Sequence, residues 1–133
     1  MTPEQKKIYF AAYHAAIEAL ESTVAYREHR TAGAKRRADA ASAAAGQAAG
    51  AASKAKSELE YGEAYERLEE AACCAELVWR TLTQNICTRM NRHDYRKWAD
   101  KIRANLASAE SSQINEGKKK TERAHIPLDF PGN

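Results

Sequence analysis

The sequence has few large aliphatic side chains. Leu, Ile, Val and Phe together account for only 17 of the 133 residues, fewer than the ~20% that usually fills a hydrophobic core. Valine occurs twice, glycine six times and proline three times, which argues against a sheet protein, because strands need β-branched residues and turns need glycine and proline. Two tryptophans and six tyrosines supply part of the missing apolar surface.

Cysteine and long apolar runs are scarce as well. The three cysteines, Cys73, Cys74 and Cys87, include an adjacent pair and have no disulfide-framework spacing. No apolar run follows the first residues, so a signal peptide is not expected. The longest uncharged stretch, residues 40–53, is too short and too weakly apolar to cross ~30 Å of hydrocarbon. We therefore predict a cytoplasmic protein that does not enter a membrane.

Motifs for catalysis are missing too. The chain has no zinc-type cysteine pairs, phosphate-binding loop or Gly-x-Ser-x-Gly motif. His14 and Glu18 stand one helical turn apart, but two ligands from one helix are too few for a metal site. Cys87 lies near His93, yet nothing in the sequence orients that histidine as a base. We predict a protein that is not an enzyme and that has no metal and no cofactor.

Alanine is the most frequent residue, with 28 copies. The first helix is predicted over residues 3–31. Thr2 and Gln5 form a capping box around Pro3, and Gly33 can end the helix. One apolar stripe at spacings of three and four residues is predicted to be buried. It consists of Phe10, Tyr13, Ile17, Leu20 and Val24.

The Ala-rich segment 33–56 has two interpretations. A seam of alanines at spacings of three and four favours a helix that approaches its neighbours closely. The seam consists of Ala34, Ala38, Ala41, Ala45, Ala48, Ala52 and Ala55. Gly46 and Gly50 each cost ~1 kcal/mol in a helix, and so rich an alanine content produces such a seam partly by chance. Both interpretations of this segment, an ordered helix and a mobile linker, therefore remain possible from the sequence.

The third and fourth helices are predicted over residues 57–89 and 92–116. Ser57 and Glu60 form a capping box for the third, and Asn91 with Asp94 caps the fourth. Trp79 and Trp98 fall on apolar stripes of these helices, so both rings are predicted to be buried. Residues 118–133 read as an extended tail with Lys118–Lys120 and alternating Ile126, Leu128 and Phe130.

The predicted fold is all-α, with one domain over residues 1–117. We expect an antiparallel bundle of three long helices, the Ala-rich segment as an additional helix or linker, and the extended tail. Because so few large aliphatics are present, we expect homo-oligomerisation or a partner to complete the buried surface.

Basic residues around the fourth helix form the most informative pattern. Glutamates dominate residues 58–76, whereas seven Lys or Arg residues occur within 79–103. Arginine-rich faces bind carboxylates or phosphates through the guanidinium fork. The same arginines could instead pair with Glu66, Glu69 and Glu70 across the bundle. The candidate residues for binding a partner or phosphate are Arg89, Arg92, Arg96, Lys97, Arg103, Tyr9 and Tyr61.

Two functions follow from this sequence. The first is a non-enzymatic, small helical protein-interaction module, such as an inhibitor, adaptor or assembly protein, that binds another protein. The small size and the general character of the sequence would suit a protein encoded by a phage or a mobile element. The alternative is a nucleic-acid or nucleotide-phosphate binding protein that uses the basic face of the last helix. No sequence motif identifies the partner.

Overall fold

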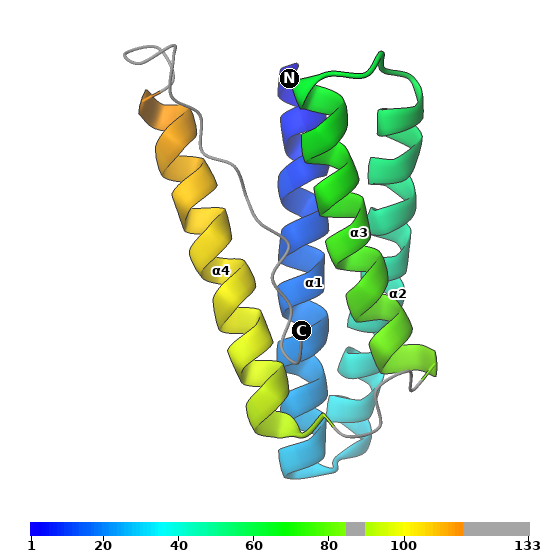
Figure 1. Cartoon of the computed structure of the whole chain (residues 1–133). Helices are drawn as coiled ribbons and strands as arrows, with labels where there is room; N and C mark the ends of the chain where they lie inside the picture. Colours follow the sequence, from blue (N-terminus) through cyan, green and yellow to red (C-terminus); the bar gives the residue numbers. More distant parts are fainter. Residues whose placement is uncertain (85–89, 116–133) are drawn as a thin grey trace.

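The computed structural model describes residues 1–84 and 90–115, with the backbone alone for residues 110–115 (Figure 1). This part of the chain forms four helices and no strands. They are α1 (Pro3–His29), α2 (Ala32–Ser57), α3 (Glu63–Gln84) and α4 (Arg92–Asn115). The predicted all-α class is confirmed. None of the described helices is both long enough and apolar enough to cross a lipid bilayer.

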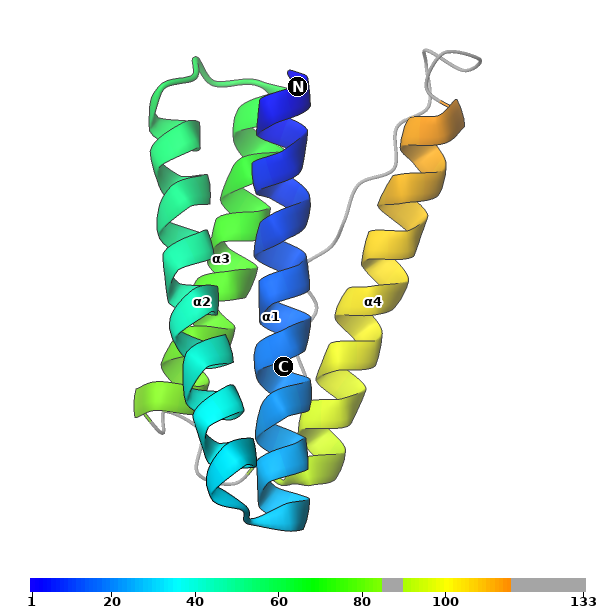
Figure 2. The ribbon, with the colours of Figure 1, turned by 180° about the vertical axis from the view of Figure 1, so that it is seen from behind.

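Helix α1 is the central helix of the fold. It contacts α2, α3 and α4, whereas α4 contacts α1 alone among the described helices. Both ribbon views show α4 leaning away from α2 and α3 along its length (Figures 1 and 2). Because three helices surround α1, it buries more than the one predicted stripe. Tyr9 is fully buried, while Phe10, which we predicted to be buried, is only partly so.

The first two helices are joined by two residues. The capping box at Thr2 is confirmed: its backbone N–H donates to Gln5 Oε1 at 2.9 Å, and the Gln5 N–H donates to Thr2 Oγ1 at 3.1 Å. The end of α1 differs from our prediction, because Arg30, with φ of 55°, takes the left-handed position instead of Gly33. Thr31 then caps α2 by accepting the Ala34 N–H at 3.0 Å. Gly33 is consequently inside α2.

The Ala-rich segment is an ordered helix, α2, which packs against α1 and α3. Its alanine seam faces the core, with Ala49 buried and Ala48 partly buried. Ala45 and Ala52 have no exposed surface. A methyl group contributes only ~0.8 kcal/mol when buried, so the main effect of these alanines is to let the helix backbones approach closely.

Gly46 leaves room for the side chain of Trp79. A Cβ atom at Gly46 would lie 2.9 Å from Trp79 Nε1 and 3.0 Å from Trp79 Cδ1, whereas a Cβ atom at Gly50 would meet nothing within 4 Å. The Trp79 ring therefore packs against α2 at Gly46. It is only partly buried, in contrast to our prediction of a buried ring.

We expect the two glycines to respond in opposite directions to alanine. Gly50→Ala should raise the free energy of unfolding by ~0.5–1 kcal/mol, because alanine is the better helix former. Gly46→Ala should lower it by about 1 kcal/mol, since overpacking against the indole outweighs the same gain. Urea unfolding of the two variants checks this, and equal stabilisation by both would contradict the close packing at Gly46.

The start of α3 corrects our prediction. Ser57 does not cap α3; it is the last residue of α2, and its hydroxyl donates to the Lys54 carbonyl at 2.7 Å. The chain turns there, with the Leu59 N–H donating to the Lys56 carbonyl at 3.0 Å. Helix α3 begins only at Glu63. Residues 58–62 are thus a connection between helices, which we name the α2–α3 connection.

The start of α4 is as predicted. Asn91 Oδ1 accepts the Asp94 N–H at 3.0 Å, and the Asn91 N–H donates to Asp94 Oδ2 at 3.1 Å. The predicted apolar stripe is buried, and Trp98 is only 2% exposed. The stripe consists of Tyr95, Trp98, Ile102, Leu106 and Ala109. The predicted end of α3 at 89 and the tail 118–133 lie outside the described residues.

Candidate functional site

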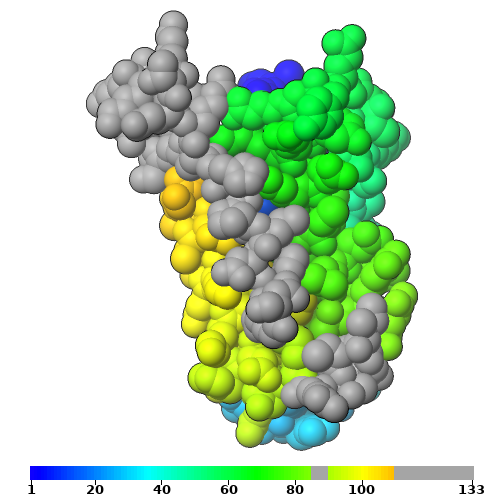
Figure 3. Space-filling view, viewed as in Figure 1, coloured from blue at the N-terminus to red at the C-terminus, as the bar shows by residue number. Residues whose placement is uncertain are grey.

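The α2–α3 connection carries the most exposed aromatic side chain. Tyr61 is 78% exposed and is the one large hydrophobic residue exposed in the part of the chain that the structure describes. The connection projects at the end of the molecule where α1 begins (Figures 1 and 3). Tyr61 was named from the sequence as a candidate for binding a partner, and the structure places its side chain on the surface.

Neighbouring side chains hold Tyr61 in place. Its ring centroid lies 5.6 Å from that of Tyr65, and its hydroxyl donates to Glu66 Oε1 at 2.6 Å. This hydrogen bond and the negative charge of Glu66 raise the pKa of Tyr61. The side chain of Tyr61 is thus held in one position, with its hydroxyl hydrogen-bonded and its ring exposed.

The surface around Tyr61 is acidic. Lys56 lies with Nζ 5.4 Å from the Tyr65 ring centroid and 3.6 Å from Glu69 Oε1. Glu58 and Glu60 are exposed, and neither forms an ion pair with another residue that the structure describes. A partner at this end would meet an aromatic pair bordered by carboxylates.

Tyr9 is not on the surface, which corrects its proposed role in partner binding. It is 0% exposed, and its ring makes edge-to-face contacts with Phe10 at 5.0 Å and Tyr13 at 5.2 Å. Burial raises the pKa of Tyr9 to about 12 and also raises the pKa of Tyr13. The reason is the central position of α1, which buries the stripe on which Tyr9 lies.

These buried hydroxyls predict a loss of stability in alkali. Because the folded pKa of Tyr9 lies above its ordinary value of 10.0, its contribution is complete below pH 10 and is lost as the pH rises toward 12. Burial raises the pKa of Cys74 from 9.0 to about 12, so this thiol adds a loss that begins near pH 9. We expect the urea midpoint to fall from pH 9 upward and to fall less steeply in Tyr9→Phe. Identical pH profiles would contradict the assignment.

The basic side chains of α4 do not form one open face. Arg96 forms an ion pair with Glu28 of α1. Arg103 binds Glu21 Oε2 at 2.5 Å and Asp100 Oδ1 at 3.1 Å. The alternative pairing with glutamates of α3 is not observed for Arg96 and Arg103, because α4 packs on α1 and, among the described helices, does not contact α3.

The other predicted basic residues are separate from these pairs. Arg92 and Lys97 are exposed on α4, and they form no ion pair with the other described residues. Arg89 lies outside the described residues, as do Lys118–Lys120. Carboxylates already neutralise the charge of Arg96 and Arg103, which weakens their attraction for a phosphate.

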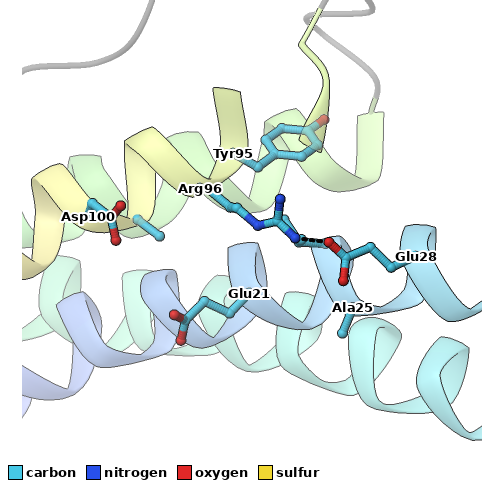
Figure 4. A pocket seen from close by; sticks show the side chains of 8 residues that line it. Glu21, Ala25, Glu28, Tyr95, Arg96 and Asp100 are labelled. Carbon is cyan, nitrogen blue, oxygen red and sulfur yellow. Dashed lines mark ion pairs between the residues drawn. The ribbon is translucent and has the colours of Figure 1, made fainter. Parts of the chain in front are cut away.

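The ion pairs border a cavity of about 300 Å³ between α1 and α4, which we name the α1–α4 cavity (Figure 4). Sequence reasoning did not find it, although a signal was present. Glu21 and Glu28 are seven residues apart, as are Arg96 and Arg103, so each pair recurs on one side of its helix and the two can face each other. The lining residues are Glu21, Val24, Ala25, Glu28, Tyr95, Arg96, Ala99 and Asp100.

A second cavity of about 260 Å³ lies between α2 and α3. Gly46, Gly50 and Trp79 line it together with Cys73. Burial raises the pKa of the Cys73 thiol, and nearby Glu69 adds to the effect. Because the thiolate is the reactive form, Cys73 is a poor nucleophile at neutral pH. Among the described residues, no three His, Cys, Asp or Glu side chains group as metal ligands would.

The comparisons with other proteins were negative: no known family, curated protein or solved structure matches this chain.

Proposed function

We propose that this chain is a non-enzymatic protein-interaction module that binds another protein through the α2–α3 connection. The observation that supports the proposal is the exposure of Tyr61, 78% of whose surface is accessible, when no other large hydrophobic residue that the structure describes is exposed. An inhibitor, an adaptor and an assembly protein are all consistent with such a surface.

Tyrosine is one of the residues on which binding energy concentrates, since its ring buries a large area while its hydroxyl stays hydrogen-bonded. The contacts of Tyr61 with Tyr65 and Glu66 already fix its side chain. Binding therefore loses less side-chain entropy than it would with a mobile tyrosine. The exposed carboxylates of Glu58 and Glu60 favour a partner surface of positive charge.

The test is capture of partners from the native cell extract with the full chain, Tyr61→Ala, and Gln47→Ala as a matched control on exposed α2. We expect Tyr61→Ala to reduce retention of the partner by a factor of about 30, as for an interface residue worth ~2 kcal/mol. Its unfolding free energy should stay within ~0.5 kcal/mol of the parent, because Tyr61 is exposed. Equal retention by all three proteins would contradict the proposal.

The phosphate-binding alternative stays a prediction, and so does homo-oligomerisation. Salt separates the two functions, because binding that neutralises several phosphates weakens steeply between 50 and 200 mM salt, by about 10³ or more for six contacts. A contact centred on Tyr61 should weaken much less over the same range.

A further inference from the structure

The end of the bundle at which α2 and α4 begin is strongly basic. The starts of these two helices lie on either side of the end of α1 (Figures 1 and 2), and the Arg27 guanidinium of α1 donates to the Met90 carbonyl at 3.4 Å, just before α4. Residues 26–39 and 90–97, which we name the basic end, contain eight Lys or Arg residues and three Asp or Glu residues. The basic end therefore has a larger positive charge than the whole chain, whose net charge is +3.

The three carboxylates of the basic end are all engaged. Asp39 pairs with Lys35 at 3.0 Å, and Glu28 pairs with Arg96. Asp94 accepts a backbone N–H at the start of α4. No carboxylate of this end is thus left to neutralise the remaining cations.

Six of the eight cations are left without a carboxylate partner among the described residues. Arg27 is half-buried, with Cζ 4.7 Å from the Tyr95 ring centroid. The other five, which we name the unpaired cations, are exposed and form no ion pair with another residue that the structure describes. They are Arg30, Arg36, Arg37, Arg92 and Lys97.

Helix stability does not account for the cations of α2. The amino end of a helix carries a partial positive charge, so acidic residues are favoured there. Helices α1, α3 and α4 have Glu4, Glu63 and Asp94 in their first turns, respectively. Helix α2 has no acidic residue in its first turn, and Arg36 and Arg37 follow directly in the next. Their charges oppose the helix dipole and repel each other, and a bound anion would relieve this repulsion.

The basic end has charge but no apolar anchor. A protein interface normally centres on buried aromatic or aliphatic side chains, and no large hydrophobic residue that the structure describes is exposed at this end. A phosphate backbone needs no such anchor, because lysine and arginine supply most of its binding. Four of the five unpaired cations are arginines, whose guanidinium fork matches two phosphate oxygens. This chemistry favours a nucleic acid over an acidic protein.

We propose that the basic end binds the phosphate backbone of a nucleic acid through its unpaired cations, without reading the base sequence. The surface differs from the basic face of α4 considered in the sequence analysis, because it includes the junction of α1 with α2 and leaves out the ion-paired arginines of α4. It lies at the opposite end of α1 from the α2–α3 connection (Figure 1). The proposal is therefore independent of protein binding at Tyr61.

The experiment is a titration of a short fluorescent DNA duplex with the full chain, followed by fluorescence anisotropy. Five phosphate contacts give a slope of about −4.5 for the logarithm of the binding constant against that of the salt concentration, so the affinity should fall about 500-fold between 50 and 200 mM salt. A duplex of unrelated sequence should bind equally well. An RNA duplex replaces the DNA in a parallel titration, and binding of neither duplex overturns the proposal.

Two double variants of equal charge place the binding at the basic end. Arg36→Gln with Arg37→Gln removes two contacts, so the loss of affinity over the same salt range should shrink to about 40-fold. Lys7→Gln with Lys54→Gln removes the same charge from exposed residues at the other end of the bundle, and the 500-fold loss should remain. Circular dichroism should show both variants as helical as the parent. Equal salt dependence of the two variants would mean attraction by net charge alone and would overturn the proposal.

A competition experiment separates phosphate from carboxylate. Unlabelled duplex should displace the labelled duplex, whereas polyglutamate at the same concentration of charge should not. Equal displacement by polyglutamate overturns the proposal and assigns the basic end to an acidic protein. Tyr61→Ala should leave all these titrations unchanged, so a failure here is distinct from a failure of the proposed function.

Discussion

Replacing Trp98 by alanine is expected to lower the free energy of unfolding by about 3–5 kcal/mol, the range for deleting a buried aromatic side chain. Trp98 is 2% exposed and belongs to the main hydrophobic cluster, together with buried residues of α1. Trp79→Ala should cost clearly less, because that ring is partly exposed and lies across Gly46. Sequence periodicity assigned the two tryptophans equal roles, and the structure ranks them.

Urea unfolding followed by far-ultraviolet circular dichroism gives both values. Lys97→Ala is a suitable control, because Lys97 is exposed and lies on the same helix turn as Trp98. Its free energy of unfolding should stay within ~0.5 kcal/mol of the parent. A Trp79→Ala variant that is less stable than Trp98→Ala would show that the α2–α3 contact matters more than the burial of α4.

The second large effect concerns the alanine seam of α2. Ala45→Leu should lower the free energy of unfolding by about 1–3 kcal/mol or more, because Ala45 has no exposed surface and the added carbons must displace packed helices. Ala44 is its neighbour on the exposed side of α2. Ala44→Leu should therefore change stability by no more than ~0.5 kcal/mol.

Thermal and urea unfolding of the two leucine variants checks the direction in which α2 faces. The comparison is stringent, since both variants have the same composition and nearly the same helix propensity. Equal stability would mean that α2 packs loosely, and a less stable Ala44→Leu would mean that the helix presents its other side to the core.

Local signals in the sequence predicted helices and several of their ends. The capping pairs Thr2–Gln5 and Asn91–Asp94 were predicted and are present with both hydrogen bonds. Such caps depend on residues three positions apart, so no tertiary information is needed. The capping box at Ser57 failed because α2 continues through this residue and occupies its hydroxyl with a carbonyl of its own last turn.

The arrangement of the helices was not predictable in the same way. Periodicity shows that a helix has an apolar side, but it does not show how many neighbours the helix has. Tyr9 was named as a candidate for binding a partner, but the three neighbours of α1 bury it. For the same reason the sequence offered glutamates of α3 as the alternative partners of the arginines, whereas Arg96 and Arg103 pair with Glu28 and Glu21 of α1.

The candidate site was predictable only in part. Tyr61 was named as a candidate for binding a partner, although it was placed inside a helix and not in the connection before α3. The α1–α4 cavity could not be predicted as a volume, because it arises where Ala25 and Ala99 face each other across two helices. The seven-residue spacing of the glutamates and arginines was the available indication.

The dependence of α4 on α1 alone has a kinetic consequence. The contacts of α1 with α2 and of α2 with α3 join helices that are adjacent in the sequence, whereas α4 docks on α1, from which some sixty residues separate it. Contacts between chain neighbours form faster than distant ones. During synthesis the first three helices can therefore assemble as they leave the ribosome. Helix α4 joins last, onto a surface that is already folded.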